Sequence, residues 1–365
     1  MQKKRIYFFI GTTAELIKLA PIIKELKIRK VEFKIITSGQ NTIHFEDLKG
    51  FIGNIRPDIS FKKKINKSSV LHFFIWAIRT FLFSFFLLGK EFKGLNKNNS
   101  YFIIHGDTVS STMGAFIGRI FGLKLVHIES GDLSFNLLEP FPEEICRRIN
   151  IYLSDILFSP NEWAKENIRK VNCVKINTYH NTLVESFLWT KSIRSRINIK
   201  KFKEYYILFM RRQEHVIFRK NWSKKIIELV IQNAKPNLNC LIVSNPLVVS
   251  ILESLKLNSY TKKNSKIKLI LPLSYPDFMK LMGGAEFIAT DGCTNQLESY
   301  LLGKPCLVLR DLTEQIEGLG ENVVLCKSDK EIIKNFLLNY KKYQTKPFIT
   351  KHKPSKIIVD NLMKY

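Results

Sequence analysis

The chain has 365 residues, 45% of them hydrophobic, with 58 Lys and Arg against 32 Asp and Glu, which gives a net charge of +26. This length predicts two domains rather than one core, and the apolar content excludes a disordered chain. A strongly positive surface attracts nucleic acid, anionic lipid or phosphorylated substrates. The basic residues are spread along the chain without a nucleic-acid-binding motif, so we expect no nucleic-acid partner.

The six cysteines show neither a CxxC pair nor the spacing of a metal site. We therefore expect reduced thiols, no metal, and a cytoplasmic protein. The excess of lysine has a simpler alternative explanation, in which lysine merely covers the solvated surface.

In the first half of the chain, short apolar runs alternate with stretches of helical periodicity. The run from Ile6 to Ile10 is typical of a strand, and GTTAELIKLAPIIKELK after it places apolar residues at helical spacing. The pattern of a strand followed by a loop recurs in FKIITSG, YFIIHGD, LKLVHIE and ILFSP. Strands that alternate with helices predict parallel βαβ units.

Residues 70–88, VLHFFIWAIRTFLFSFFLL, are nearly all apolar or aromatic. The segment is just long enough to span a bilayer, but Arg79 at its middle would be costly there, and its neighbours must share one sheet. Lysines flank it on both sides, at positions 62, 63, 64, 67, 90 and 93. We expect a helix that lies in an anionic membrane surface; the alternative is an unusually hydrophobic crossover helix buried in the domain.

Acidic residues follow or open several of these elements: Asp107 in HGDT, Glu129 in HIESG and Glu143 in FPEEICRR. Open α/β sheets bind ligands at the carboxyl ends of their strands. Carboxylates gathered there can move protons on and off a substrate, which predicts an enzyme. The alternatives are a helix N-cap for Asp107 and an ordinary first-turn pair for Glu143 and Glu144.

A second series of strands begins near Tyr205, with YYILFM, NCLIVSN, IKLILP, EFIATDG and CLVLRD. The sequence thus predicts an α/β fold of two Rossmann-like, doubly wound domains that face a cleft. The N-terminal domain is expected at 1–190 and the C-terminal, nucleotide-binding domain at 203–345. The tail, residues 346–365, is expected to pack back on the N-terminal domain.

From about residue 5 to about residue 330 the chain resembles the bacterial non-hydrolysing UDP-N-acetylglucosamine 2-epimerases, as a divergent member. The segments that carry the resemblance are, in order, GTTAELIKLAP, SGQ, HGDT, HIESG, FPEEICRR, HNTLVES, PLSYPDF and TDGCTNQLESYLLGKPCLVLRDLTE. The resemblance implies the GT-B architecture and inversion of carbon 2 of a UDP-N-acetylhexosamine, from UDP-GlcNAc to UDP-ManNAc, by elimination and re-addition of UDP. It further implies no cofactor besides the UDP-sugar substrate, a homodimer, and a role in surface polysaccharide biosynthesis.

The resemblance also implies site residues. It assigns catalysis to Asp107, Glu129 and Glu143 and substrate contacts to Lys18 and Arg147. On the nucleotide side it assigns Phe278 to uracil and Glu298 to the ribose. It assigns the diphosphate to the turn formed by Gly292, Cys293 and Thr294. Arg211 and Arg212 are further candidates for binding the diphosphate.

The family pattern is broken at several positions, four of them functional in the family. Thr13 and Gln315 stand where the family has arginines, and Asn41 and Met210 where it has histidines. Such cations and donors stabilise a diphosphate leaving group, so their loss leaves a second function open. In this alternative the chain is a GT-B glycosyltransferase that uses a nucleotide sugar and a lipid-linked or glycan acceptor, docked on the inner face of the cell membrane. A third possibility is a scaffold with decayed catalysis.

Overall fold

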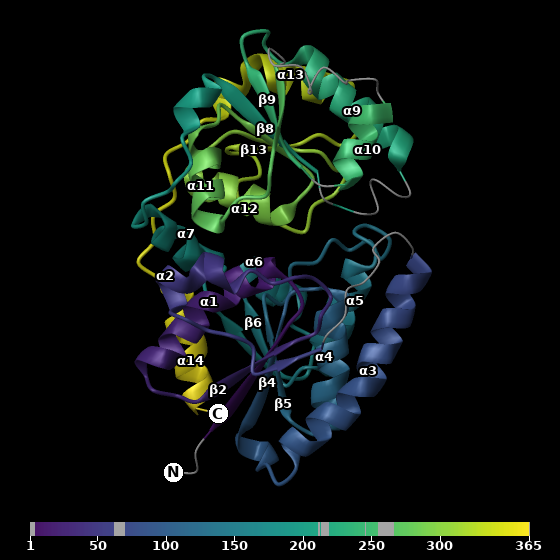
Figure 1. Cartoon of the computed structure of the whole chain (residues 1–365), viewed down its shortest axis with the longest axis vertical. Coiled ribbons are helices and arrows are strands. Elements are labelled where there is room, and N and C mark those ends of the chain that lie inside the picture. Colours follow the sequence, from purple (N-terminus) through teal and green to yellow (C-terminus); the bar gives the residue numbers. More distant parts are fainter. Residues whose placement is uncertain are drawn as a thin grey trace. The chain divides into compact units, whose positions relative to one another are not determined.

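The computed structural model describes residues 4–61, 70–210, 212, 219–244, 246–254 and 266–364. The chain divides into two compact units (Figure 1). Unit 1 comprises Met1–Trp189 with Lys351–Tyr365, and unit 2 comprises Thr190–Thr350. Each unit is built on one parallel sheet, with seven strands in unit 1 and six in unit 2. The predicted α/β class with two Rossmann-like sheets is therefore confirmed.

The sheet of unit 1 has the order β3-β2-β1-β4-β5-β6-β7. Its strands are β1 (Arg5–Ile10), β2 (Phe33–Thr37), β3 (Ile59–Ser60), β4 (Ser100–His105), β5 (Lys124–Ile128), β6 (Ile156–Ser159) and β7 (Val174–Asn177). Its helices are α1 (Thr13–Ile28), α2 (Lys49–Ile52), α3 (Val70–Phe92), α4 (Val109–Ile120), α5 (Glu143–Leu153), α6 (Glu162–Asn167), α7 (Leu183–Lys191) and α14 (Pro354–Lys364). Short 3-10 turns lie at Phe45–Leu48 and Lys97–Asn99.

Both faces of this sheet are covered, as the alternating side chains of β1 show. Ile6 and Phe8 belong to a buried cluster with residues of α1 and α14, whereas Tyr7 and Phe9 belong to another with residues of α3 and α4. A strand buried on both faces needs a continuous apolar run, which is the pattern that identified β1 in the sequence.

The C-terminal helix α14 packs beside α1 in unit 1 (Figure 1). Its Ile358, Val359 and Leu362 are wholly buried in the cluster that contains Ile6. The Lys4 ammonium donates to the backbone oxygens of residues 362 and 363, both at 2.8 Å. A cation at the last carbonyls of a helix is favourable for its dipole. The chain thus returns to unit 1 at its end.

The sheet of unit 2 has the order β10-β9-β8-β11-β12-β13. Its strands are β8 (Tyr205–Phe209), β9 (Asn239–Val243), β10 (Ile267–Ile270), β11 (Ile288–Thr290), β12 (Cys306–Val308) and β13 (Val323–Leu325). Its helices are α9 (Lys220–Asn233), α10 (Pro246–Ser254), α11 (Tyr275–Gly284), α12 (Cys293–Leu302) and α13 (Lys330–Asn339), with 3-10 turns at Ile199–Phe202 and Tyr340–Tyr343.

The strand order reverses between β1 and β4 in unit 1, and between β8 and β11 in unit 2. Ligands of open α/β sheets bind beyond the carboxyl ends of the strands at such points. Asp107 follows β4 and Glu129 follows β5, while Gly292 is the second residue after the end of β11. The candidate residues therefore lie at the ligand-binding edges of their own sheets.

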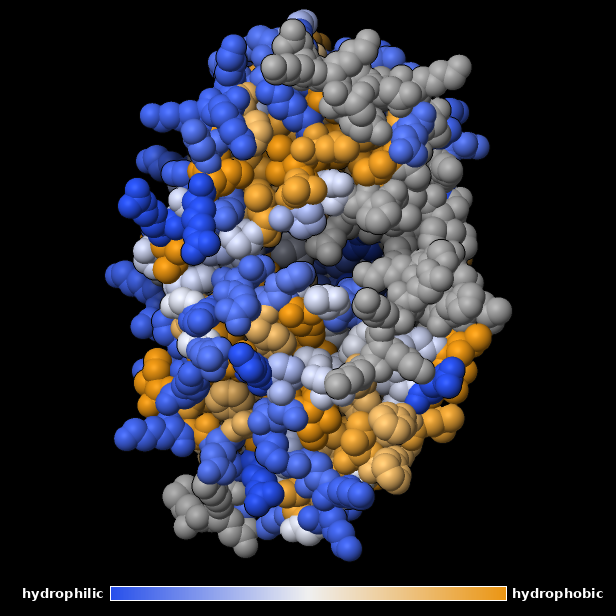
Figure 2. Space-filling model, viewed as in Figure 1, coloured by the Kyte–Doolittle hydropathy of each residue, from blue (hydrophilic) through white to orange (hydrophobic). Residues whose placement is uncertain are grey.

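Helix α3 contains the apolar segment predicted at 70–88. Trp76, Leu88 and Phe92 on one side are buried against α4 and the sheet. An opposite stripe of large apolar side chains is exposed, and Figure 2 shows apolar residues gathered over this helix. Among the residues that the structure describes, no helix combines the length and apolar character needed to cross a membrane.

The packing of α14 predicts a strong effect of its core residues on stability. Leu362→Ala should lower the free energy of unfolding by about 2–5 kcal/mol, because it removes buried methyl groups and leaves a cavity. The matched control is Leu338→Ala on α13, whose side chain is 65% exposed. Urea unfolding measures both; equal losses would contradict the described burial of α14.

Candidate active site

The Glu129 carboxylate at the edge of the unit 1 sheet has several polar partners. Both of its oxygens lie 2.7 Å from the Lys18 ammonium, which projects from α1. Asn181 donates its side-chain amide to Oε2 at 2.7 Å, and His105 Nε2 lies 3.2 Å from the same oxygen. Glu129 itself has a φ of 66°, a left-handed backbone that glutamate rarely adopts and that is concentrated at functional sites.

These contacts determine the charge of the pair. Burial opposes ionisation of Glu129, but the Lys18 ammonium and His105 hold the pKa of its carboxyl well below the usual value. Burial also disfavours the Lys18 cation, but Glu129 keeps the pKa of Lys18 above its usual value. Both groups therefore remain charged at neutral pH, and Glu129 is a weak proton acceptor in this arrangement.

A second buried cation, Arg147 on α5, holds Asp107. Its Nη2 donates to the Asp107 carboxylate, and its Nη1 donates to Glu144 at 2.5 Å. Glu144 is wholly buried and also accepts from Arg148 and from the backbone N–H of Ser134. Glu144 thus holds the guanidinium that contacts Asp107.

The N-cap alternative for Asp107 is wrong. The N-cap of α4 is Thr108, whose hydroxyl accepts from the backbone N–H of Ser111 at 2.9 Å. A threonine caps a helix well, so the carboxylate of Asp107 does not serve the helix end.

Glu143 begins α5 and is partly exposed. It lies one turn before Arg147 on the same helix, so the two share a face. Burial, together with the charges of Asp107 and Glu143, raises the pKa of the Cys146 thiol to about 11. Because Arg147 contacts Asp107, the face of α5 that carries Glu143 is the face turned toward Asp107.

The turn after β1 is closed to a phosphate group. The backbone N–H of Gly11 donates to the buried Glu15 carboxylate at 2.7 Å. A Cβ on Gly11 would lie 2.4 Å from Ser110 Cβ, so α4 packs directly on this glycine. In dinucleotide-binding Rossmann folds such an N–H meets the pyrophosphate. Here a side-chain carboxylate already occupies that place, so unit 1 does not offer the usual nucleotide site.

In unit 2, the turn after β11 leads into a helix end without a side-chain cap. Gly292 is the N-cap of α12, and among the residues described no side chain caps this end. The first N–H groups of such a helix attract anions. Arg212 donates its Nε to the backbone oxygen of Asp291 at 3.0 Å, which brings a guanidinium to the turn.

A second guanidinium joins the first. Arg310 Nη1 lies 2.8 Å from Glu314 Oε2, and Arg212 Nη2 lies 2.9 Å from Glu314 Oε1. Both also donate to the sulfur of Cys293, at 2.8 and 3.3 Å. Burial raises the pKa of the Cys293 thiol to about 11, so it is neutral at physiological pH. Sequence reasoning identified Cys293 and Arg212 but not Arg310 and Glu314, which lie in the quoted motif LRDLTE.

The other nucleotide-side candidates also lie at this edge or behind it. Phe278 on α11 is partly exposed, with its ring centroid 5.6 Å from that of Phe209. Thr294 is partly exposed in the first turn of α12. Glu298 is only 2% exposed and accepts from the side-chain amide of Asn295 at 2.8 Å. Arg211 lies outside the described residues.

The residues at the substituted family positions make local contacts. Met210 is buried in the core cluster of unit 2, and Gln315 is also buried. Thr13 accepts from the backbone N–H of His44 at 3.1 Å, and the backbone N–H of Asn41 donates to Gly11 at 3.2 Å.

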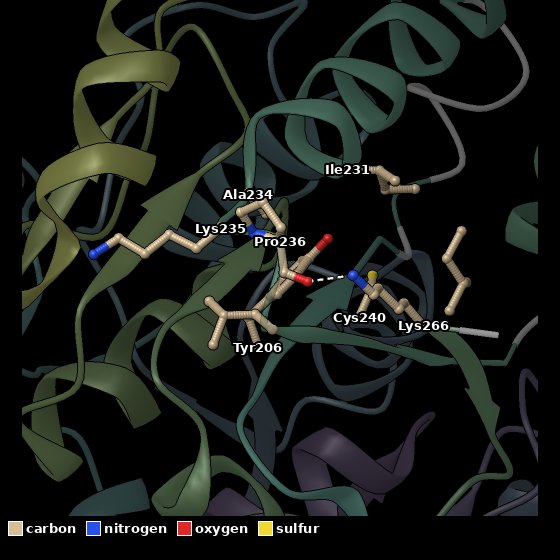
Figure 3. Close-up of a pocket in the computed structure, with 9 residues that line it drawn as sticks. Tyr206, Ile231, Ala234, Lys235, Pro236, Cys240 and Lys266 are labelled. Atoms are coloured by element: carbon tan, nitrogen blue, oxygen red, sulfur yellow. Dashed lines mark hydrogen bonds between the residues drawn. The ribbon is translucent and has the colours of Figure 1, made fainter. Parts of the chain in front are cut away.

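A cavity of about 260 Å³ lies elsewhere in unit 2 (Figure 3). Its lining includes Tyr206, Cys240 and Ile267, from the first residues of β8, β9 and β10, and Ala234 after the end of α9. It thus lies at the amino ends of the strands, opposite the ligand-binding edge, and none of the candidate residues lines it.

Comparisons with known proteins agree on one family. Residues 94–357 match the family model described as UDP-N-acetylglucosamine 2-epimerase. The chain is 30% identical to a UDP-N-acetylglucosamine 2-epimerase of Methanococcus maripaludis, over 91% of this chain and 90% of the relative. The fold is similar to that of two crystal structures of enzymes named UDP-GlcNAc 2-epimerase. That of Methanocaldococcus jannaschii, in complex with UDP-GlcNAc and UDP, has 26% identity and a TM-score of 0.82, with coverage of 99% and 100%. That of Neisseria meningitidis, bound to UDP-GlcNAc, has 26% identity and a TM-score of 0.79 at the same coverage.

The ionisation of Glu129 can be tested by exchanging its partner. Lys18→Met removes the ammonium, the largest cause that lowers the pKa of Glu129, and leaves burial opposed by His105, so this pKa should rise. Carboxyl ¹³C NMR should show a Glu129 signal that does not titrate between about pH 4 and 7 in the native protein but does so in the variant. Lys24→Met, an exposed position on the same helix, should leave the signal unchanged. Titration of Glu129 across this range in the native protein would contradict the assignment.

Proposed function

The chain belongs to the UDP-N-acetylglucosamine 2-epimerase family, and from this premise we propose how its residues divide the reaction. The chain is an isomerase that interconverts UDP-GlcNAc and UDP-ManNAc. The observation that carries the proposal is the set of three carboxylates at one edge of unit 1, two of them held by buried cations. The relatives reported above are named as epimerases, so the glycosyltransferase alternative has no support from them.

Inversion at carbon 2 requires one group that takes the proton and another that returns it on the opposite face. We assign these steps to Asp107 and Glu143. Arg147 is the cation that contacts Asp107, and Glu143 is partly exposed at the start of α5. Positioned carboxyl groups of this kind serve as general base and general acid. One group takes the proton when UDP is eliminated, and the other returns it when UDP is added back.

Glu129 has a different role in this proposal. Its carboxylate is held ionised by Lys18 and is bonded to Asn181, so it is a poor choice for taking a proton. Positive charge builds on the sugar ring as its bond to UDP breaks. A carboxylate fixed in its ionised state stabilises such charge without having to reorganise, and we assign Glu129 this electrostatic role.

Unit 2 is assigned the nucleotide. The uncapped N-terminus of α12 and the guanidinium of Arg212 suit the diphosphate. Arg310 adds a second guanidinium beside Cys293. This guanidinium compensates for cations that the family has at other positions and this chain lacks. Phe278 is assigned to uracil and Glu298 to the ribose. We also assign the Thr294 hydroxyl to the diphosphate.

UDP-ManNAc is a precursor that a cell would use for surface polysaccharide, and the cytoplasm is the compartment we propose for its synthesis. A homodimer remains the expected assembly.

The exposed side of α3 supports a second proposal, contact with an anionic membrane surface. Large apolar side chains of α3 and α4 are exposed together: Ile75, Ile78, Leu82, Phe83, Phe86, Phe116 and Ile120. Exposed cations border them, among them Arg79, Lys90 and Lys93. An apolar stripe edged with cations matches the interface of an anionic bilayer. The flanking lysines at 62, 63, 64 and 67 lie outside the described residues.

Vesicle co-sedimentation tests the membrane proposal. The protein should sediment with vesicles that contain phosphatidylserine and not with neutral ones, and Leu82→Ser with Phe86→Ser should abolish binding. Leu338→Ser, at an exposed leucine of unit 2, is the control and should bind normally. If the protein binds no vesicles and light scattering shows a dimer that the α3 changes dissociate, a second copy covers this face and the membrane proposal is wrong.

The catalytic assignment is tested with UDP-GlcNAc in D₂O. The native protein should form UDP-ManNAc with deuterium at carbon 2. Asp107→Asn and Glu143→Gln should each lower kcat by about 10²–10⁴-fold, because each removes a proton-transferring group. Glu166→Gln, at a side chain that is 62% exposed, is the matched control and should retain full activity. Native-like turnover in either site variant would remove that residue from the proposed pair.

A further inference from the structure

Helix α5 presents one face to the turn that carries Asp107. Glu143, Arg147 and Asn150 follow one another at intervals of four and three residues, so they lie on one side of the helix. Arg147 contacts the carboxylate of Asp107. One turn further along, the side-chain amide of Asn150 donates to the backbone oxygen of Gly106 at 3.1 Å. The helix therefore holds Asp107 by its side chain and by the peptide bond before it.

The Gly106 carbonyl has a second donor. His127 Nε2, from β5, lies 2.7 Å from the same oxygen. Burial lowers the pKa of His127 to about 3, so its ring is neutral at physiological pH and Nε2 carries the hydrogen that this bond requires. The backbone N–H of Gly106 donates to Ile128 at 3.0 Å, and its φ is +63°. Because the peptide group is planar, these bonds determine the direction in which Asp107 leaves the turn.

Asn150 also joins α5 to α4. Its amide nitrogen donates to the Ser111 hydroxyl at 2.8 Å, and the residue is wholly buried. Among the described residues, no donor reaches the amide oxygen of Asn150. A buried acceptor without a partner is unfavourable. Asn150 therefore contributes to the structure through the two hydrogen bonds that its amide nitrogen donates.

We propose that Asn150, together with His127, is a positioning residue that sets the separation between the carboxyl groups of Asp107 and Glu143. Asn150 lies on the helix that begins with Glu143 and bonds to the turn that ends with Asp107, so it links the two groups through the backbone. Removal of a proton from one face of a sugar and its return to the other depends on this separation. The inference rests on the proposed function, since it presumes that these two carboxyl groups transfer the proton.

The test uses the full-length protein and two substitutions. Asn150→Asp keeps the size of the side chain but replaces the donating nitrogen with an oxygen, which repels the Gly106 carbonyl. Asn150→Ala removes the donors altogether. In both variants kcat should fall about 10- to 100-fold while KM for UDP-GlcNAc changes less than about two-fold, because misplacement of a catalytic group acts on the chemical step.

Asn322 in unit 2 offers a matched control. It is also wholly buried, and its amide nitrogen donates to the backbone oxygens of Ser299 at 3.1 Å and Lys304 at 2.7 Å. Asn322→Ala should lower the melting temperature by an amount similar to Asn150→Ala, yet leave kcat per folded molecule unchanged. A purely structural role for Asn150 predicts the same behaviour for both residues.

The outcomes separate the two proposals. If the native protein forms no UDP-ManNAc and exchanges no deuterium, the proposed function fails. If the native protein is active and folded Asn150→Asp turns over at the native rate, the positioning role alone is overturned. Should the Asn150 variants not fold, His127→Gln, which keeps a nitrogen donor, is compared with His127→Leu. Higher kcat for the glutamine variant supports the role of the Gly106 carbonyl, and equal values refute it.

Discussion

Two buried cations hold the acidic edge of unit 1 together, and the proposed chemistry depends on them. Lys18 bonds to both oxygens of Glu129, and Arg147 joins Asp107 to Glu144. A carboxylate taken out of water without a cation would neutralise itself by binding a proton. The two pairs therefore keep the charges and also hold the groups in place. Because the pairs tie α1 to β5 and α5 to β4, they also join elements that are far apart in the sequence.

Long, buried strands were predictable from the sequence because they form continuous apolar runs, as in β1, β4 and β8. Strands β3, β7 and β13 were missed. β3 has two residues and β13 three, and every residue of β7 is only partly buried, so none gives a periodic signal. The apolar segment in α3 was ambiguous for a physical reason. Its periodicity is that of a helix apolar on most sides, and only the fold shows which side packs.

The candidate site was predictable in part. Resemblance assigned Glu129, Lys18 and Arg147, and the structure places the first two in contact although 111 residues separate them. No local pattern reports such a contact. Asn181, His105 and Asn150 were missed because a single amide or imidazole in a motif does not reveal its hydrogen-bond partner. Glu144 was interpreted with Glu143 as a first-turn pair, whereas the fold buries one and leaves the other partly exposed.

The most direct test of the account is a crystal structure of the protein with UDP-GlcNAc bound. The account predicts that carbon 2 of the sugar lies within about 3.5 Å of a carboxyl oxygen of Asp107 or Glu143, the distance at which a proton can be transferred. It also predicts that Glu129 still bonds to Lys18 in the complex. A sugar ring that contacts neither Asp107 nor Glu143, or that takes Glu129 away from Lys18 to face carbon 2 directly, would contradict the assignment of roles.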